Sequence, residues 1–365
     1  MKKLPQSLKV KNEQGNVAII VALSIVAFIS FTALSIDIGY ALVTRNQLQN
    51  VADSAALAAT RRLSHDYYDG KSFPDQQAVT VAACRSTLVT TAQQAAAANI
   101  AGGKYITSIN DSDIIIGQWH SLTKSLTPDA NPPDAVKVTA RRDASANAPI
   151  TTFFAGIFGT KQVSVTASAT AALTAQSTAP QGRIPFPAGI SDYWFSAGGG
   201  CNQPIQFYPT GSLSGCAGWH TYTTSPSNAS TLKTILKGLT DGTFQTPETL
   251  AGQTLYAFTG GTVASDFNEM KNLFDAMRVK NDGVFDLDTN PNTWTTTVIV
   301  YDRNDCSNPT GTLTVLGFAT ATITSVVGSP SKVINAVVAC NSFVTGGRGG
   351  GSDYGSKGTI PGLVQ

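Results

Sequence analysis

The sequence predicts an α+β protein in which a long N-terminal transmembrane helix carries a small α/β module, followed by a β-rich, sandwich-like domain with inserted helices. Three observations support this. An uncharged run covers residues 17–36, a period-two alternation marks residues 163–170, and the second half is rich in Gly, Thr, Ser and short apolar runs. A length of 365 residues with 42% hydrophobic content is enough for two folded units.

The overall charge excludes several classes of function. The net charge is +2, only 13% of residues are charged, and no basic run follows residue 12, so no nucleic-acid partner is expected. The three histidines have no second ligand at metal spacing, and no hydrolase, P-loop or dinucleotide motif occurs. We therefore expect no enzymatic activity, no cofactor and no small-molecule substrate.

Residues 1–15 form a basic leader, and the run Val17–Ile36 is long enough to cross the hydrocarbon core of a bilayer, about 30 Å thick, as one helix. Lysines dominate the leader, which predicts a cytoplasmic N-terminus and places the rest of the chain on the other side of the membrane. A cleaved signal peptide is the rival interpretation. The length of the run and the absence of a small-residue cleavage site favour an uncleaved anchor.

The helix is expected to continue to residue 62, so residues 16–62 form one element. Beyond the span, apolar residues recur at three- and four-residue spacing, which predicts an amphipathic helix with a face made mostly of alanine. Small side chains allow close approach of a neighbour. This face packs either on the protein's own next domain or, in part, on neighbouring subunits. The candidate assembly face comprises Asp37, Tyr40, Arg45, Leu48, Ala52, Ala55, Ala56 and Ala59.

Two of these residues lie next to the span. Tyr40 suits the membrane interface, where an aromatic ring with a polar end is favoured. A carboxylate at the depth of Asp37 is costly unless it reaches water or a partner. Because Asp37 lies at the outer end of the span, we expect it to reach water rather than to make a buried assembly contact.

The α/β module is predicted to occupy residues 63–175. A helix is expected over 74–99, with Ser72 as its cap, and strands are expected over 113–119, 135–141 and 162–173. The aromatic-rich segment 150–158 is interpreted as a short helix or turn that covers the sheet.

Three strings in this half resemble a known family, and one of them is Ser35-Ile-Asp-Ile-Gly-Tyr40. Gly15-Asn-Val-Ala-Ile-Ile20 and Arg45-Asn-Gln-Leu-Gln-Asn-Val-Ala-Asp-Ser-Ala-Ala-Leu-Ala-Ala59 are similar to the N-terminal region of TadG-like proteins of the Tad (Flp) pilus assembly system. Segments 151–159 and 163–171 also resemble that family. The resemblance implies a pilin-like module and a structural or assembly role, with the protein anchored in the inner membrane and its bulk in the periplasm. It also implies partners among pilus assembly or pseudopilin proteins.

The sequence departs from the pattern of the related pseudopilins at one position. Those proteins carry a glutamate five residues after the cleavage glycine, and here that residue is Ile20. The departure agrees with an uncleaved, anchored protein and argues against a major pilin subunit.

Residues 176–183 are interpreted as a polar linker, residues 184–345 as the β-rich domain, and residues 346–365 as a flexible, glycine-rich tail. Within the domain, apolar strands are expected over 296–301, 311–319 and 333–338. Helices are expected over 230–239 and from about residue 265, the second with Phe267, Met270, Phe274 and Met277 on one face.

Four of the five cysteines lie in this domain, which suits an oxidising compartment. Of the three possible pairings, the short-range bridges Cys201–Cys216 and Cys306–Cys340 are the economical choice. Cys84 is expected to be a buried free thiol.

Two further hypotheses concern ligands. Asp286, Asp288 and Asn290 alternate like the first ligands of a calcium loop, but Pro291 stands where the turn glycine belongs, so a solvated turn is preferred. The alternative function is an exposed adhesin or ligand-binding module, with Trp194, Trp219 and Tyr222 as an aromatic surface. The metal motif of von Willebrand type A domains is absent from the sequence.

Overall fold

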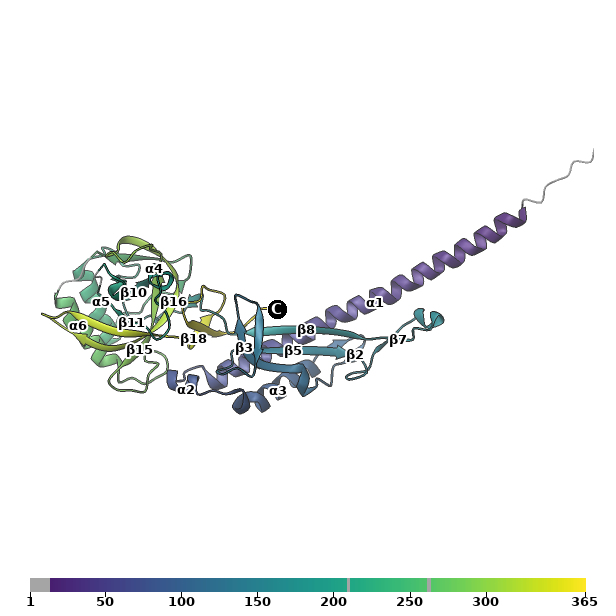
Figure 1. The fold of residues 1–365 in the computed structure, drawn as a ribbon, viewed down its shortest axis with the longest axis horizontal. Coiled ribbons are helices and arrows are strands. Elements are labelled where there is room, and N and C mark those ends of the chain that lie inside the picture. Colours follow the sequence, from purple (N-terminus) through teal and green to yellow (C-terminus); the bar gives the residue numbers. More distant parts are fainter. Residues whose placement is uncertain (1–13, 209–210, 261–263) are drawn as a thin grey trace, which may run out of the picture.

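A single helix of 54 residues, α1 (Gln14–Tyr67), runs from one end of the molecule to its middle (Figure 1). The structure is a computed structural model that describes residues 14–208, 211–260 and 264–365. The expected leader lies almost wholly outside the described residues. The helix extends five residues beyond its predicted end because Leu63 and Ser64 are buried where it meets the rest of the chain.

The second predicted helix is divided into α2 (Phe73–Gln77) and α3 (Val81–Ala97). Ser72 caps α2 as expected, because its side chain accepts a hydrogen bond from the amide of Asp75. Thr80 caps α3 in the same way through the amide of Ala83. The single helix expected over 74–99 was therefore wrong, since a second capping residue starts a new helix.

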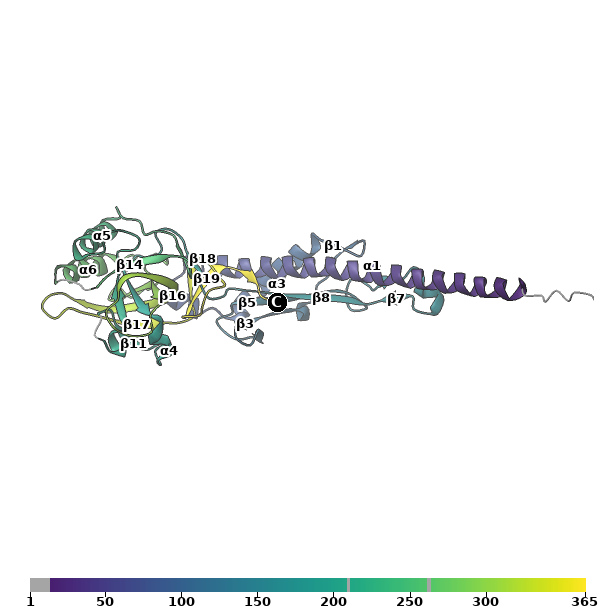
Figure 2. The same ribbon diagram turned by 90° about the horizontal axis from the view of Figure 1, so that it is seen from above.

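A five-stranded antiparallel sheet packs against α1, with α3 beside it (Figure 2). The three predicted strands are confirmed to within a few residues, and the buried face of the third contains Val165, Ala167 and Ala169 as the alternation predicted. The spatial order of the strands is β20 (Gly362–Leu363), β8 (Val165–Ala172), β5 (Ala135–Arg142), β3 (Ile114–His120) and β4 (Ser125–Pro128).

Two small hairpins lie at the end of the sheet nearest the start of α1. One consists of β1 (Ile100–Ala101) and β2 (Lys104–Tyr105). The other, here called the aromatic hairpin, covers residues 150–163 and consists of β6 (Ile150–Thr151), the short helix η2 (Ala155–Phe158) and β7 (Gln162–Val163). It runs beside α1 toward the start of that helix (Figures 1 and 2).

The β-rich domain with inserted helices is confirmed, and the strands of its core lie in one mixed sheet. Pairing is antiparallel except between β10 and β15. The sheet has the order β11 (Pro204–Gln206), β17 (Val333–Ala339), β16 (Thr310–Val327), β15 (Trp294–Tyr301), β10 (Ala188–Ser191) and β12 (Ala217–Trp219), with β14 (Leu255–Thr259) paired to the start of β16.

Helices α5 (Ala229–Asp241) and α6 (Ala264–Met277) pack on each other, and α6 also contacts β16. The predicted apolar face of α6 is buried in the domain core. The remaining elements are short, and they are η1 (Asp111–Asp113), β9 (Thr178–Ala179), α4 (Asp192–Ser196), η3 (Leu213–Gly215) and β13 (Thr249–Leu250).

The segment predicted as a flexible tail is ordered instead. Strand β18 (Ser342–Arg348) pairs in parallel with β19 (Ser356–Ile360), and β20 adds an edge strand to the first sheet. The prediction failed because the glycines serve close packing rather than flexibility: a Cβ on Gly351 or Gly358 would overlap a backbone carbonyl oxygen. The expected linker is also packed, since its strand β9 pairs with β13 and contacts β18.

Candidate anchoring and docking site

The first third of α1 presents apolar side chains to the outside. Exposed Ile, Leu, Val and Phe side chains cover residues 17–36, and Ala33 is the one buried residue in that range. Among the described residues, this is one helix long and apolar enough to cross a membrane. A water-exposed apolar surface of this size would be strongly unfavourable.

The alanine-lined part of α1 is buried inside the chain. Leu48, Ala52, Ala55, Ala56 and Ala59 are fully buried in one core with α3 and the sheet. Of the two interpretations left open by the sequence, the structure therefore shows packing on the protein's own module. Those five residues are not available to a neighbouring subunit.

Polar side chains at several positions along α1 bond to the backbone of the first sheet and of the neighbouring small hairpin. The Gln49 side-chain amide donates a hydrogen bond to the carbonyl of Ser168 at 3.1 Å, and the Thr60 hydroxyl donates to that of Ala171 at 3.2 Å. The amide of Gly102 donates to Gln47 Oε1 at 2.8 Å. Each bond also satisfies a backbone group that the close packing removes from water.

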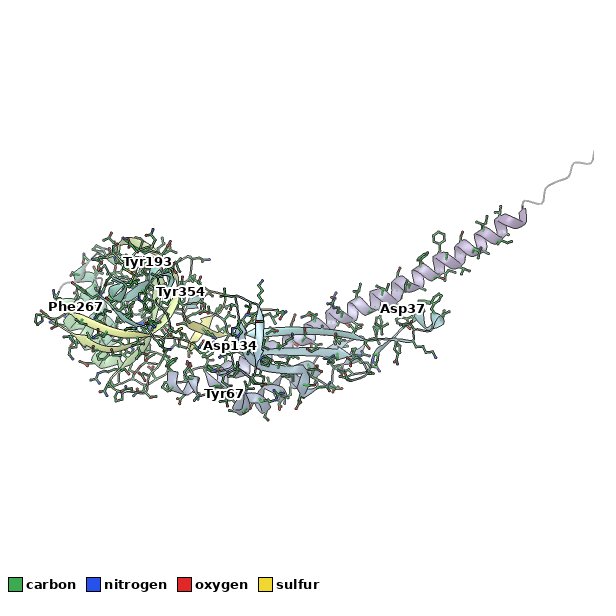
Figure 3. The ribbon with its side chains drawn as sticks, viewed as in Figure 1. Asp37, Tyr67, Asp134, Tyr193, Phe267 and Tyr354 are labelled. Carbon is green, nitrogen blue, oxygen red and sulfur yellow. A yellow bond between two sulfur atoms is a disulfide. The ribbon has the colours of Figure 1, made fainter. Side chains whose placement is uncertain are left out.

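Asp37 holds the aromatic hairpin against α1 (Figure 3). Its carboxylate accepts three backbone hydrogen bonds, from Phe153 and Ala155 at 2.6 Å and from Phe154 at 3.0 Å. The residue is 7% exposed, so the expectation that it reaches water was wrong. No local pattern predicts these bonds, because the amide donors lie more than a hundred residues away.

The other two members of the predicted face are not fully buried, and Tyr40 packs against the edge of the alanine-lined core. Tyr40 donates a hydrogen bond to the carbonyl of Gly102 at 3.0 Å, and its ring packs edge-on against Phe153 at 5.4 Å between centroids. Arg45 is exposed. One exposed stretch of α1 beyond the span, here called the outer stripe, contains Leu42, Val43, Arg45, Asn46 and Asn50.

The far end of α1 joins the second domain. Tyr68 stacks on Phe343 with ring centroids 3.8 Å apart, and the Gln76 side chain exchanges hydrogen bonds of 2.9 Å with both backbone groups of Phe343. Lys357, which is partly buried, forms an ion pair with the buried Asp134 at 2.6 Å. Burial raises the pKa of Asp134, and the Lys357 ammonium opposes that rise.

The predicted disulfide pairing was wrong, although the four cysteines are those expected. The bridges join Cys201 to Cys340 and Cys216 to Cys306. Proximity in sequence misled the prediction because the sheet order brings β11 beside β17, so Cys201 lies next to Cys340. Cys84 is a buried free thiol, as expected.

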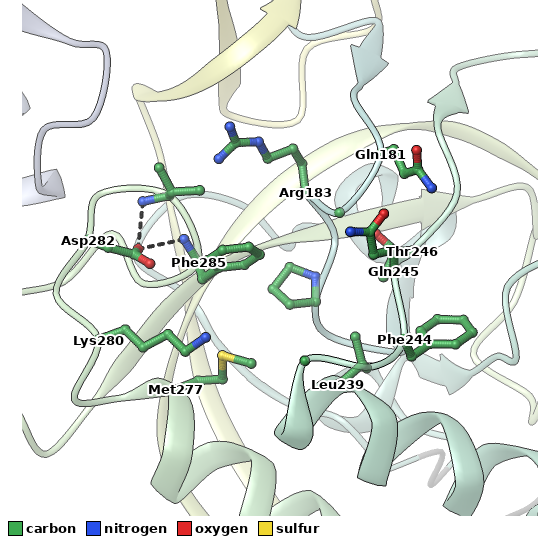
Figure 4. Close-up of a pocket in the computed structure, with 14 residues that line it drawn as sticks. Gln181, Arg183, Leu239, Phe244, Gln245, Thr246, Met277, Lys280, Asp282 and Phe285 are labelled. Carbon is green, nitrogen blue, oxygen red and sulfur yellow. Dashed lines mark hydrogen bonds between the residues drawn. The ribbon is translucent and has the colours of Figure 1, made fainter.

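The β-rich domain is here called the distal domain. A pocket of about 450 Å³ opens in it between α5, α6 and residues 181–185 (Figure 4). On one side, the oxygen Oδ1 of Asp282 accepts hydrogen bonds from the amides of Val284 and Phe285. The Lys280 ammonium lies 4.8 Å from the centre of the Phe285 ring. The pocket has no arrangement of groups that points to a reaction.

In the suggested calcium loop, side-chain oxygens accept hydrogen bonds from nearby backbone amides and so stabilise turns. Asp288 Oδ1 accepts hydrogen bonds from the amides of Thr289 and Asn290, and Asn290 Oδ1 accepts one from Asn292. Within the described residues, no group of three or more potential metal-binding His, Cys, Asp or Glu side chains occurs. Asp286 is fully buried, and burial raises the pKa of its carboxyl group to about 6.

The aromatic surface proposed for an adhesin does not exist. Trp194, Trp219 and Tyr222 have at most 3% of their surface exposed and belong to the core of the distal domain. Figure 3 shows that the first sheet lies between this domain and Asp37. The observation that favoured the alternative function is therefore removed.

The two regions that form the helix and its module both match family models. A model described as putative Flp pilus-assembly TadE/G-like matches residues 15–62, and one described as putative Tad-like Flp pilus-assembly matches residues 74–171. No match was found among curated proteins or among solved structures. The matched ranges hold most of α1, together with α3 and the central strands of the first sheet. Residues 15–62 and 74–171 of this chain are therefore similar to the Tad (Flp) pilus-assembly family.

Proposed function

We propose that the protein is a non-enzymatic component of a Tad-type pilus assembly or secretion apparatus, anchored in the inner membrane by the first third of α1. The observation that carries the proposal is the division of one uninterrupted helix. Its first part is apolar and exposed, and its second part is buried in a module that matches the pilus-assembly family.

The N-terminus is cytoplasmic and the module and distal domain are periplasmic in this proposal. Lysines precede the span, and short lysine-rich flanks stay in the cytoplasm. The two bridges joining Cys201 to Cys340 and Cys216 to Cys306 favour an oxidising compartment for the distal domain.

Docking of other pilus proteins takes place on the outer stripe rather than on the alanine face. Leu42 and Val43 are both more than half exposed and follow the span directly. Because the alanine face is filled by the chain's own sheet, the outer stripe, which is exposed and lies close to the span, is the surface of α1 proposed to bind a pseudopilin or another assembly protein.

A deletion and complementation experiment tests this function. We expect pilus yield in the sheared surface fraction to be lost on deletion of the gene and restored by the wild-type chain and by Val26→Leu. Val26→Arg should fail to restore it and should leave the membrane fraction, since an arginine at the centre of a span costs about 2.5–3.5 kcal/mol on insertion scales. Undiminished pilus yield in the deletion strain would contradict the proposal.

A further inference from the structure

We infer that the aromatic hairpin is a second membrane contact, whose tip inserts into the outer leaflet of the same bilayer that α1 spans. This inference rests on the anchoring part of the proposed function. The hairpin exposes three large apolar side chains at its tip: Phe153, Ile157 and Phe158 are 65%, 81% and 69% exposed. The segment from Thr151 to Thr160 contains no charged residue.

The position of the hairpin along α1 fixes its depth. Phe154 lines an apolar groove together with Phe28, Ile29, Thr32, Ala33 and Ile36 of the helix. Those residues form the outer end of the predicted span. At 1.5 Å per residue, the hairpin follows the span for about 12 Å, close to the thickness of one leaflet of the hydrocarbon core.

The burial pattern supports the same placement. Ala33, the one buried residue between Val17 and Ile36, lines the groove that Phe154 closes. The exposed apolar surface of the hairpin is continuous with the lipid-facing surface of the helix. Lipid that surrounds the span would therefore also contact the apolar tip of the hairpin.

The backbone of the hairpin is prepared for an apolar environment, where an unsatisfied amide costs several kcal/mol. Asp37 accepts the amides of Phe153, Phe154 and Ala155. The amides of Thr152 and Thr160 donate to the carbonyls of Lys161 and Ala155, at 3.1 and 3.0 Å. These five amides of the hairpin thus have partners within the chain.

Residues just outside this depth suit the lipid headgroups. Lys161 is the first charged residue after the tip, and it is exposed. On the neighbouring hairpin, Lys104 and Tyr105 are exposed beside Gly102, to which Tyr40 bonds. Lysine and tyrosine are the residues that anchor proteins at the membrane interface.

Nitroxide depth measurements test the inference on the full chain in phospholipid nanodiscs of mixed phosphatidylethanolamine and phosphatidylglycerol. In a Cys84→Ala background, a single labelled cysteine replaces Ile157, Leu23 or Leu122. Leu23 lies in the span, and Leu122 is a fully exposed residue of the β3–β4 turn. The collision rates of the label with oxygen and with a water-soluble nickel chelate report its depth.

We expect the Ile157 label to collide with oxygen several-fold more often relative to nickel than the Leu122 label does, as the Leu23 label should. The hairpin inference would be overturned if the Ile157 label collided with nickel as often as the Leu122 label, while the Leu23 label still collided mainly with oxygen. That result would not contradict the membrane anchor. Protection of Ile157 from both reagents would also overturn it, because a protein partner would then cover the tip. Nickel access at Leu23 would instead contradict the anchor itself.

A charge variant supplies the matched control. Phe158→Asp, in the chain labelled at Ile157, should shift the label toward nickel, whereas Leu122→Asp should leave its depth unchanged. An unchanged depth in Phe158→Asp would contradict insertion by the apolar tip.

Discussion

Asp37 is the residue on which the membrane-proximal part of the structure depends. One carboxylate satisfies three amides at the start of η2 and ties the aromatic hairpin to α1. Hydrogen bonds to an ionised acceptor contribute about 1.5–3 kcal/mol each, and loss of the carboxylate would leave the three amides without this acceptor.

Asp37→Ala should therefore release the hairpin without unfolding the molecule. We expect amide hydrogen exchange over residues 152–160 to become at least ten-fold faster, because a local loss of about 1.4 kcal/mol gives that factor. Asp53→Ala is the control, since Asp53 accepts only a local bond from Gln49. Equal exchange in both variants would contradict the role given to Asp37.

Asp286 and His220 give the distal domain opposing responses to pH. Burial raises the pKa of Asp286 from 3.8 to about 6, so its contribution to stability is full below about pH 3.8 and is lost as the pH rises through 6. Burial lowers the pKa of His220 from 6.5 to about 3, so its contribution is full above pH 6.5 and is lost as the pH falls.

Asp286→Asn should remove the pH dependence of stability that comes from Asp286 and leave the one that comes from His220. The free energy of unfolding of the wild type relative to Asp286→Asn is expected to fall by about 2–3 kcal/mol from about pH 4 to about pH 7. Urea unfolding of the detergent-solubilised chain, followed by tryptophan fluorescence, measures it. A difference independent of pH would show that Asp286 titrates in its ordinary range.

Among the elements, α1 packs closely on the module because the side chains on its buried face are small. Ala55 is fully buried against the module, whereas Ala58 on the same helix is half-buried. Overpacking a core with extra methylenes costs about 1–3 kcal/mol. We expect Ala55→Leu to lower the unfolding free energy by that amount and Ala58→Leu to lower it much less. Similar losses at both positions would contradict the close contact between helix and sheet.

The returning C-terminal segment depends on glycine for the same physical reason. A Cβ on Gly351 would overlap the carbonyl oxygen of Gln176, whereas one on Gly362 would meet no atom within 4 Å. Gly351→Ala should destabilise the chain by about 1–3 kcal/mol, and Gly362→Ala should change its stability little. Thermal unfolding of the two variants tests this, and a neutral Gly351→Ala would contradict the ordered packing of residues 349–360.

Elements with a local signal could be predicted from the sequence, and pairings across the chain could not. The length of α1, the strand over 165–172 and the buried face of α6 follow from periodicity and apolar content. The disulfide pairing, the donors to Asp37 and the ordered C-terminal strands depend on which distant segments meet. The C-terminal glycines illustrate this limit. Glycine occurs both in flexible segments and where two backbones pack closely, so its presence in the sequence does not distinguish the two cases.

At the scale of the whole molecule, α1 connects three levels. Residues 28–40 of α1 meet the aromatic hairpin. The middle of the helix packs on the first sheet, and its end contacts β19 next to the distal domain (Figure 1). The joint is built from Tyr68, Gln76 and the ion pair of Asp134 with Lys357. In the proposed orientation, this arrangement holds the distal domain away from the membrane while leaving the outer stripe open to a partner.

Photo-cross-linking in living cells tests whether this anchored helix docks with the pilus apparatus. A photoreactive amino acid replaces Val43 on the outer stripe, and the same substitution at exposed Leu122 serves as the control. We predict a covalent adduct with a Tad pilus protein from Val43, and none from Leu122. Adducts from Val43 that contain no pilus protein, or no adduct in cells that assemble pili, would contradict the account.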